Sequence, residues 1–306
     1  MEIISVNNVC KSYGKLRALD GISFTVNKGD IIGYIGPNGS GKTTTISAIT
    51  NLCNIDKGQI NIYGEDNRIN YGKNLSKISI INENNGLYDG VSAVANLKFF
   101  TSAVNMDKKE AQKRIDELLY DFNLFDRRKD PIKKYSKGMK RKLEIARAII
   151  YKPEILILDE PFDGIDVESK ISIITLLKEY AQRNNISIIL TSHIMEDIEN
   201  LANRIIILKT GKKILDESTE TFMNRAYNKY INIEFAENID YKKFVNINNE
   251  SGLFNILKYG NKYIKCQAID DNINIYEIIQ KEDIHIRDIY IKRDNINEIY
   301  LRMVKS

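Results

Sequence analysis

Nine consecutive residues rich in glycine and hydroxyl groups could hold phosphate, and they are Gly36, Pro37, Asn38, Gly39, Ser40, Gly41, Lys42, Thr43 and Thr44. Glycines let successive backbone N–H groups curl around phosphate oxygens, and a helix N-terminus adds the positive end of its dipole. Lys42 supplies a point charge, and the Thr43 hydroxyl can coordinate Mg²⁺. The run therefore predicts a site for a nucleoside triphosphate and Mg²⁺.

Two acidic residues, Asp159 and Glu160, follow the apolar run 155–158. A continuous apolar run that ends in acids is typical of a central parallel strand whose carboxyl end faces a ligand. Hydrolysis of a terminal phosphate needs a carboxylate near Mg²⁺ and a group that orients or deprotonates the attacking water. We assign Asp159 to the metal and Glu160 to the water as general base. An ordinary strand–turn junction is the competing interpretation.

His193 follows a second apolar run, residues 186–191. If this strand lies parallel to the one that precedes Asp159, the imidazole reaches the same edge of the sheet. A neutral imidazole there can donate to the terminal phosphate and polarise the pair of water and carboxylate. A histidine that only caps a helix or packs is the alternative.

The elements that must position these residues predict an α/β fold. The phosphate-binding run lies between an apolar run, 31–35, and a helix-compatible segment, 45–51, and such a loop requires this strand–loop–helix context. Strands then alternate with helices, which indicates a parallel sheet. A helix-rich insert occupies residues 92–126, and residues 218–306 change in texture and are interpreted as a small α+β appendage.

A second anion site is predicted at residues 135–139, which read Tyr-Ser-Lys-Gly-Met. Ser136 is a favourable residue to begin a helix. Its hydroxyl and the backbone N–H of Gly138 could bind a phosphate at that helix N-terminus. Because the chain already has one complete phosphate cradle, a second one makes sense if it serves the nucleotide of a partner subunit.

In order and spacing, these motifs resemble those of the ATPase subunits of ATP-binding cassette (ABC) transporters over roughly residues 1–217. The resemblance implies a P-loop ATPase with a mixed-sheet core, ATP and Mg²⁺ as cofactors, and a helical subdomain at about 84–152. It also implies a homodimer that closes over two ATP molecules. That dimer would drive separate multi-span permease subunits, which contact the helical subdomain at the cytoplasmic face of the membrane.

Several residue roles come only from this resemblance. Tyr13 would stack on adenine, and Ser136 with Gly138 would form the signature that closes on ATP held by the other subunit. Gly164 and Asp166 would belong to the loop that crosses the dimer interface.

The resemblance also has departures. Most family members carry, at the position of Glu83, a glutamine that contacts Mg²⁺ and the attacking water. A glutamate at this position resembles the variant found in some antibiotic-peptide and drug exporters. Lys137 replaces the first of two glycines in the signature, which is common in exporter-type sequences. Together with the appendage after a single ATPase domain, these features imply export of a drug or an antimicrobial peptide.

Bulk properties set broad limits. The chain has 306 residues, 43% hydrophobic and 28% charged, with a formal net charge of +4. This content suits an ordinary globular core and predicts no general role in nucleic-acid binding. Three widely spaced cysteines form neither a disulfide framework nor a metal pattern, which favours a reducing compartment. No signal peptide or membrane-spanning run is apparent, so we expect another chain to carry out the membrane work.

A soluble ABC-type ATPase that acts on nucleic acid or ribosomes is the alternative function. The basic stretch from Arg127 to Lys142 would be its footprint. Against this alternative, the chain has neither a long coiled-coil insertion nor a second cassette. A P-loop kinase is a weaker interpretation, because it would leave residues 136–139 and His193 without a role.

Overall fold

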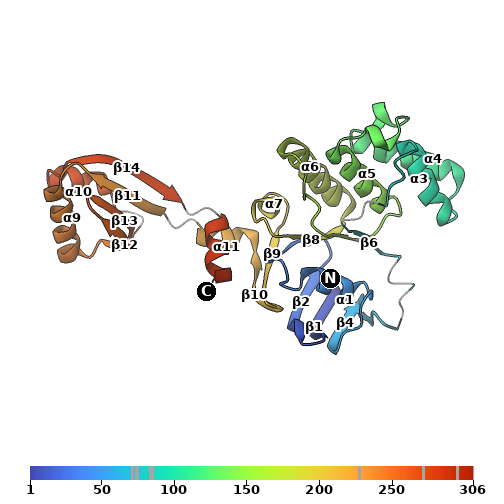
Figure 1. Ribbon diagram of the computed structural model, residues 1–306, viewed down its shortest axis with the longest axis horizontal. Coiled ribbons are helices and arrows are strands. Elements are labelled where there is room, and N and C mark those ends of the chain that lie inside the picture. The colour runs from blue at the N-terminus through green and yellow to red at the C-terminus, as the bar shows by residue number, and fades with distance from the viewer. Residues whose placement is uncertain are drawn as a thin grey trace. The chain divides into compact units, whose positions relative to one another are not determined.

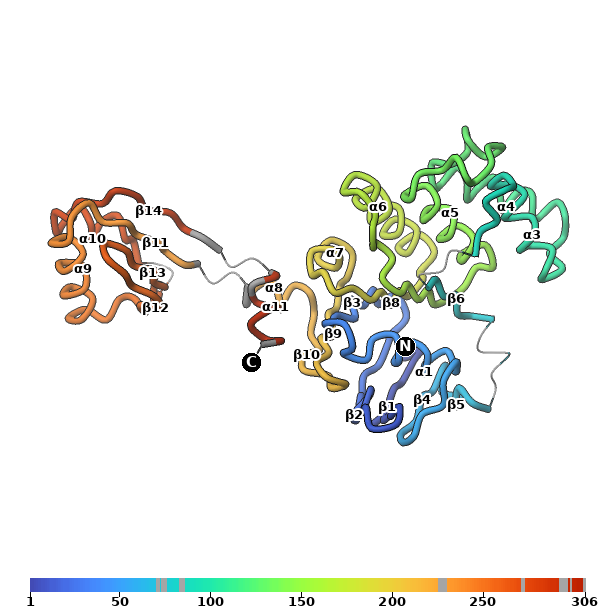
Figure 2. Tube along the Cα trace, in the orientation of Figure 1, coloured from blue at the N-terminus to red at the C-terminus, as the bar shows by residue number. Residues whose placement is uncertain are grey.

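The computed structural model describes residues 1–69, 72, 76–82, 86–226, 229–270, 273–293 and 296–305. The chain divides into two compact units, Met1–Thr219 and Glu220–Ser306, and both can be followed along the chain in Figures 1 and 2. The sequence had suggested a division after residue 217. In the part of the chain described, no helix is both long and apolar enough to cross a bilayer.

The first unit begins with an antiparallel sheet in the order β2-β1-β4-β5. Its strands are β1 (Glu2–Tyr13), β2 (Leu16–Asn27), β4 (Lys57–Ile62) and β5 (Glu65–Asp66). Between β1 and β2 the chain turns at Gly14, whose φ of 59° suits a glycine. This turn leaves Tyr13 at the end of β1.

A second sheet of the same unit has the order β10-β9-β3-β8-β7-β6. Its strands are β3 (Ile31–Ile35), β6 (Ile78–Ile81), β7 (Ile155–Leu158), β8 (Ser187–Ser192), β9 (Arg204–Lys209) and β10 (Lys212–Ser218). All neighbouring pairs are parallel except β9 with β10. The central strands β3, β7 and β8 are buried throughout, as their unbroken apolar runs predict.

The phosphate-loop helix α1 (Lys42–Ile49) shares one hydrophobic core with both sheets. Ile46 of α1, Ile4 of β1 and Ile157 of β7 all belong to that cluster. The mixed-sheet α/β core predicted from the sequence is confirmed.

Helices fill the chain between β6 and β7, where the helix-rich insert was predicted. They are α3 (Ala93–Ala103), α4 (Lys108–Asp121), α5 (Lys137–Ile149) and the short 3₁₀ turns η1 (Phe125–Arg127) and η2 (Ile132–Lys134). The N-caps of α3, α4 and α5 are Ser92, Asp107 and Ser136, and each side chain accepts a backbone N–H of its own helix. After β7 come α6 (Val167–Asn184) and α7 (Glu196–Glu199).

Past α8 (Thr219–Ala226), the second unit runs β-α-β-β-α-β and then a last helix. The elements are β11 (Lys229–Phe235), α9 (Asn238–Ser251), β12 (Phe254–Gly260), β13 (Tyr263–Ala268), α10 (Ile275–Lys281), β14 (Ile286–Arg293) and α11 (Ile296–Lys305). The sheet order is β12-β13-β11-β14 with every pair antiparallel, which is the split β-α-β arrangement. Phe235, Phe244 and Phe254 pack in its core.

Candidate functional site

The phosphate loop joins the end of β3 to the start of α1. A Cβ on Gly36 would lie 2.3 Å from Ser40 Oγ and 2.7 Å from the Leu208 carbonyl oxygen. Gly41 has a φ of 105°, and a Cβ there would meet the Ala18 carbonyl oxygen at 2.6 Å. Both positions therefore require glycine. By contrast, a Cβ on Gly39 would have no atom within 4 Å, so the loop is open on that side.

Lys42 is held inside the loop by backbone oxygens. Its Nζ donates to the carbonyl of Gly36 at 2.8 Å and to that of Pro37 at 3.4 Å. Only 7% of the side chain is exposed. Ser40 Oγ is buried and lacks a hydrogen-bond partner among the described residues. The loop thus holds a cation and an unpaired hydroxyl, while Asn38 and Thr43 are exposed and Thr44 is half-buried.

The two acids follow β7 directly. Asp159 is 6% exposed, and its backbone N–H donates to the Ile81 carbonyl on β6 at 2.9 Å. Glu160 has a φ of 47°, in the left-handed region that a residue with a side chain seldom adopts. This turn of the backbone sends the Glu160 carboxylate toward the phosphate loop, where its Oε1 lies 3.3 Å from Lys42 Nζ.

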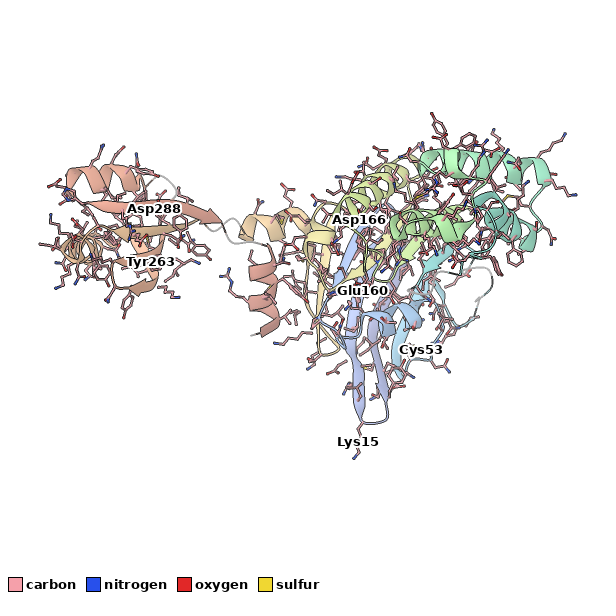
Figure 3. The ribbon with its side chains drawn as sticks, turned by 45° about the horizontal axis from the view of Figure 1, so that its top comes forward. Lys15, Cys53, Glu160, Asp166, Tyr263 and Asp288 are labelled. Atoms are coloured by element: carbon pink, nitrogen blue, oxygen red, sulfur yellow. The ribbon has the colours of Figure 1, made fainter. Side chains whose placement is uncertain are left out.

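His193 comes to the same place from β8. Its Nδ1 lies 3.0 Å from Glu160 Oε2, and the imidazole is 43% exposed. Glu160 therefore bridges Lys42 and His193, one with each carboxylate oxygen. Figure 3 labels Glu160 in the middle of the first unit, between the helices and the antiparallel sheet.

Tyr13 lies beside the phosphate loop although the two are far apart in the sequence. Burial is the main cause that raises the pKa of Tyr13, and a side-chain hydrogen bond with Cys53 adds to it, while one with Thr44 lowers it. The ring itself is 51% exposed. Lys11 Nζ lies 5.2 Å from the centroid of the Tyr13 ring, and the exposed part of this side chain leaves aromatic surface for stacking.

Ser136 and Gly138 lie at the first turn of α5. Ser136 Oγ accepts the backbone N–H of Met139 at 3.2 Å, so the side chain turns back on its own helix. Gly138 packs against α6, since a Cβ on it would lie 2.3 Å from Ser169 Oγ. Their contacts are thus with α5 and α6 rather than with the phosphate loop.

Gly164 and Asp166 precede α6. Gly164 has a φ of 66°. The Asp166 carboxylate accepts the backbone N–H of Ser169 at 2.9 Å, and this bond holds the pKa of Asp166 below its usual value. Asp166 is exposed and lies nearer to the helices than Glu160 in Figure 3.

A cleft of about 270 Å³ lies between α5 and the residues that follow β7. Lys137 and Arg141 of α5 line it together with Glu160, Asp163 and Ile165.

Glu83, the position predicted to stand for the usual glutamine, lies outside the described residues. One contact was missed at the sequence level: the Thr191 hydroxyl joins Asp159 and Glu160. A hydroxyl residue at the end of a buried strand was its only sequence signal.

Comparison with known proteins shows the family of the chain. A family model described as ABC transporter matches residues 19–163. The linearmycin resistance ATP-binding protein LnrL of Bacillus subtilis is 39% identical over 212 residues, covering 69% of this chain and 68% of that protein. The bacitracin transport ATP-binding protein BcrA of Bacillus licheniformis is 36% identical over 235 residues, covering 77% and 76%. A solved ATP-binding subunit of an ABC transporter superposes with a TM-score of 0.64 at 26% identity, covering 73% of this chain and 92% of that one.

Proposed function

The chain belongs to the family of ABC transporter ATP-binding proteins, and from that premise we propose that it is the ATPase subunit of an exporter of drugs or antimicrobial peptides. Members of this family bind and hydrolyse ATP, and they work with membrane permease subunits. The substrate class is supported by two relatives, one named for linearmycin resistance and one for bacitracin transport. The meeting of Lys42, Glu160 and His193 beside an open phosphate loop carries the proposal.

ATP would place its phosphates over residues 36–44 and its adenine against Tyr13. The open side of the loop at Gly39 leaves room for phosphate, and the unpaired Ser40 hydroxyl offers it a hydrogen bond. The N-terminus of α1 adds the positive end of its dipole.

Mg²⁺ would be held by the Thr43 hydroxyl and the Asp159 carboxylate. Both are hard oxygen donors of the kind that Mg²⁺ prefers. Mg²⁺ takes one or two carboxylates together with substrate phosphates, so one aspartate and one hydroxyl would suffice on the protein side. The ion would neutralise charge on the phosphates.

Hydrolysis would begin with an exchange at Lys42. The Glu160 carboxylate now pairs with Lys42, and the terminal phosphate would take its place on that cation. Once released, Glu160 would accept a proton from the attacking water as general base. His193, 3.0 Å from Glu160, would orient the carboxylate and donate to the phosphate.

A homodimer would complete the site. Ser136 and Gly138 at the N-terminus of α5 would bind the terminal phosphate of ATP held by the other subunit. Gly164 and Asp166 would line the same interface. The support is geometric: Ser136 and Asp166 are both exposed, at the positive ends of two helices whose first turns touch.

The membrane permease would bind the helical subdomain, at about residues 84–152, and so hold the chain at the cytoplasmic face of the membrane. An aromatic cluster supports this surface. Tyr88 and Phe99 are 49% and 53% exposed, with ring centroids 5.0 Å apart. Phe100 stacks with Tyr88, and the Arg147 guanidinium lies over the Phe100 ring. Exposed aromatic residues beside an arginine are typical of protein interfaces.

The alternative, action on nucleic acid or ribosomes, is weakened because three cations of the basic stretch are already paired with acids. Arg127 pairs with Asp130 at 2.9 Å, Lys140 with Asp89 at 2.7 Å, and Arg141 with a buried Glu144. Such paired cations are less available to phosphates of a nucleic acid.

The test is ATP hydrolysis by the purified chain, alone and with its permease. We expect Mg²⁺-dependent turnover in the wild type and none in Lys42→Ala. Retention on RNA at physiological salt, without hydrolysis and without a membrane partner, would instead support the alternative.

A further inference from the structure

We propose that Thr191 is a positioning residue for ATP hydrolysis, because its one hydroxyl holds both strand-end acids, Asp159 and Glu160. This role rests on the proposed function, since it concerns how the two acids are held rather than what they do. Thr191 lies near the end of β8 and is 0% exposed.

The direction of both hydrogen bonds follows from the groups involved. The backbone N–H of Glu160 can only donate, so Thr191 Oγ1 accepts it, at 2.9 Å. The hydroxyl has a single proton, which is therefore free to go to Asp159 Oδ1 at 2.6 Å. That length is normal for a hydroxyl that donates to an ionised carboxylate.

The bond to Glu160 secures an unusual backbone. Glu160 has a φ of 47°, and a non-glycine residue in this region persists only where its surroundings hold it. This conformation aims the carboxylate at Lys42 and His193. Thr191 holds the backbone of Glu160, and His193, the first residue after β8, contacts its carboxylate. Glu160 is thus fixed from β8 at two points.

The hydroxyl of the next residue, Ser192, contacts neither of the two acids but bonds elsewhere. Ser192 Oγ lies 3.3 Å from Asp197 Oδ2 and accepts the N–H of Ile194 at 2.9 Å. Register explains the difference, because Leu158 of β7 pairs with Leu190 of β8, which brings Thr191 level with Asp159. With Thr191 fully buried, a lost hydroxyl would leave an acceptor and a donor without a partner in a place closed to solvent.

The experiment compares kcat and KM for ATP in three variants of the full chain. Thr191→Val keeps the shape and removes the hydroxyl, Thr191→Ser keeps the hydroxyl, and Thr101→Val is the matched control. Thr101 is also buried, at 2% exposed, and its hydroxyl bonds to the Lys98 carbonyl of its own helix α3.

We expect kcat of Thr191→Val to fall by ~10- to 10²-fold, the scale of a misplaced catalytic group, with KM and the affinity for a fluorescent ATP analogue nearly unchanged. Thr191→Ser should restore most of kcat, and Thr101→Val should match the wild type. If Thr191→Val does not fold, Thr191→Ala against Thr191→Ser isolates the hydroxyl in the same way.

Three results would overturn the role. One is a kcat in Thr191→Val close to that of the wild type. Another is an equal loss in Thr191→Val and Thr101→Val with equal lowering of the melting temperature, which would indicate lost stability alone. The third is a failure of Thr191→Ser to restore kcat. A wild-type chain that binds ATP without any turnover would instead reject the proposed function itself.

Discussion

Two regions of the first unit differ in how much of their chemistry one chain supplies. Beyond the ends of β3, β7 and β8, the Glu160 carboxylate lies 3.3 Å from Lys42 Nζ with one oxygen and 3.0 Å from His193 Nδ1 with the other. At the first turns of α5 and α6, Ser136 and Asp166 turn their side chains back on their own helices. The first region brings a cation, an acid and an imidazole together within one chain, whereas we propose that the second region is half of a site that another subunit completes.

The largest effect should come from the cation of the first region. We expect Lys42→Ala to abolish measurable ATP binding, because the phosphates lose a buried charge-assisted contact. Titration with a fluorescent ATP analogue measures it. An unchanged affinity would reject the assignment of the phosphate loop.

Glu160→Gln should separate binding from hydrolysis. Turnover should fall by ~10²-fold or more, the scale of losing a general base. ATP affinity should be kept or rise, because the neutral amide no longer competes as an anion for Lys42. Single-turnover hydrolysis and equilibrium binding give the two numbers, and normal hydrolysis would place the base elsewhere.

Ser136→Arg tests whether the second region acts on the partner. We expect turnover to fall while each subunit still binds ATP, because the phosphate loop is untouched. Mixed with Glu160→Gln, it should recover activity that neither variant has alone, since one of the two sites in the mixed dimer is then intact. If mixing restores nothing, the signature does not act across subunits.

A smaller effect is expected at the aromatic cluster of the helical subdomain, where a substitution should affect permease binding rather than ATP hydrolysis. Phe99→Asp should weaken co-purification with a co-expressed permease and leave the basal turnover of the chain alone unchanged, because the side chain is 53% exposed and its ring contacts Tyr88 and Phe100. Tyr120→Asp, on α4 and 73% exposed, is the control. Equal loss of co-purification in both variants would argue against the aromatic cluster as the docking surface.

The smallest effect concerns the cap of α6. The pKa of Asp166 is lowered by the Ser169 N–H, so its stabilisation is present at neutral pH and is lost as pH falls through the lowered value. Asp166→Asn keeps an oxygen for the cap but carries no charge to titrate. The small advantage of the wild type in melting temperature should therefore shrink between pH 7 and pH 3. A constant difference across that range would show that the charge contributes nothing to the cap.

The proximity of the phosphate loop, Glu160 and His193 could be predicted from the sequence, because each follows an apolar run that forms a parallel strand of one sheet. Lys42, for example, follows a strand and begins a helix, as the motif requires. The contact of Thr191 with Asp159 could not be recognised in this way. It depends on the register of β7 with β8, which brings together residues more than thirty positions apart.

The second unit was harder to predict, because helix propensity and burial in the folded unit favour different structures for some of its segments. The α+β class was expected, but strand β12 and helices α9 and α10 were not. Helix α9 is rich in asparagine, a poor helix former, and the burial of Phe244 and of Asp240 in the folded unit overrides that preference. The Asp240 carboxylate accepts the N–H of His285, a partner that is remote in the sequence.

The close approach of Gly138 to Ser169 has a mechanical consequence. The Ser169 hydroxyl lies so close to Gly138 that even a methyl group on Gly138 would collide with it. The first turns of α5 and α6 therefore meet with no flexible side chain between them at this point. We therefore expect the two helices to move together. In the homodimer that we propose, Ser136 at the start of α5 and the loop that precedes α6 would reach the other subunit as one rigid surface.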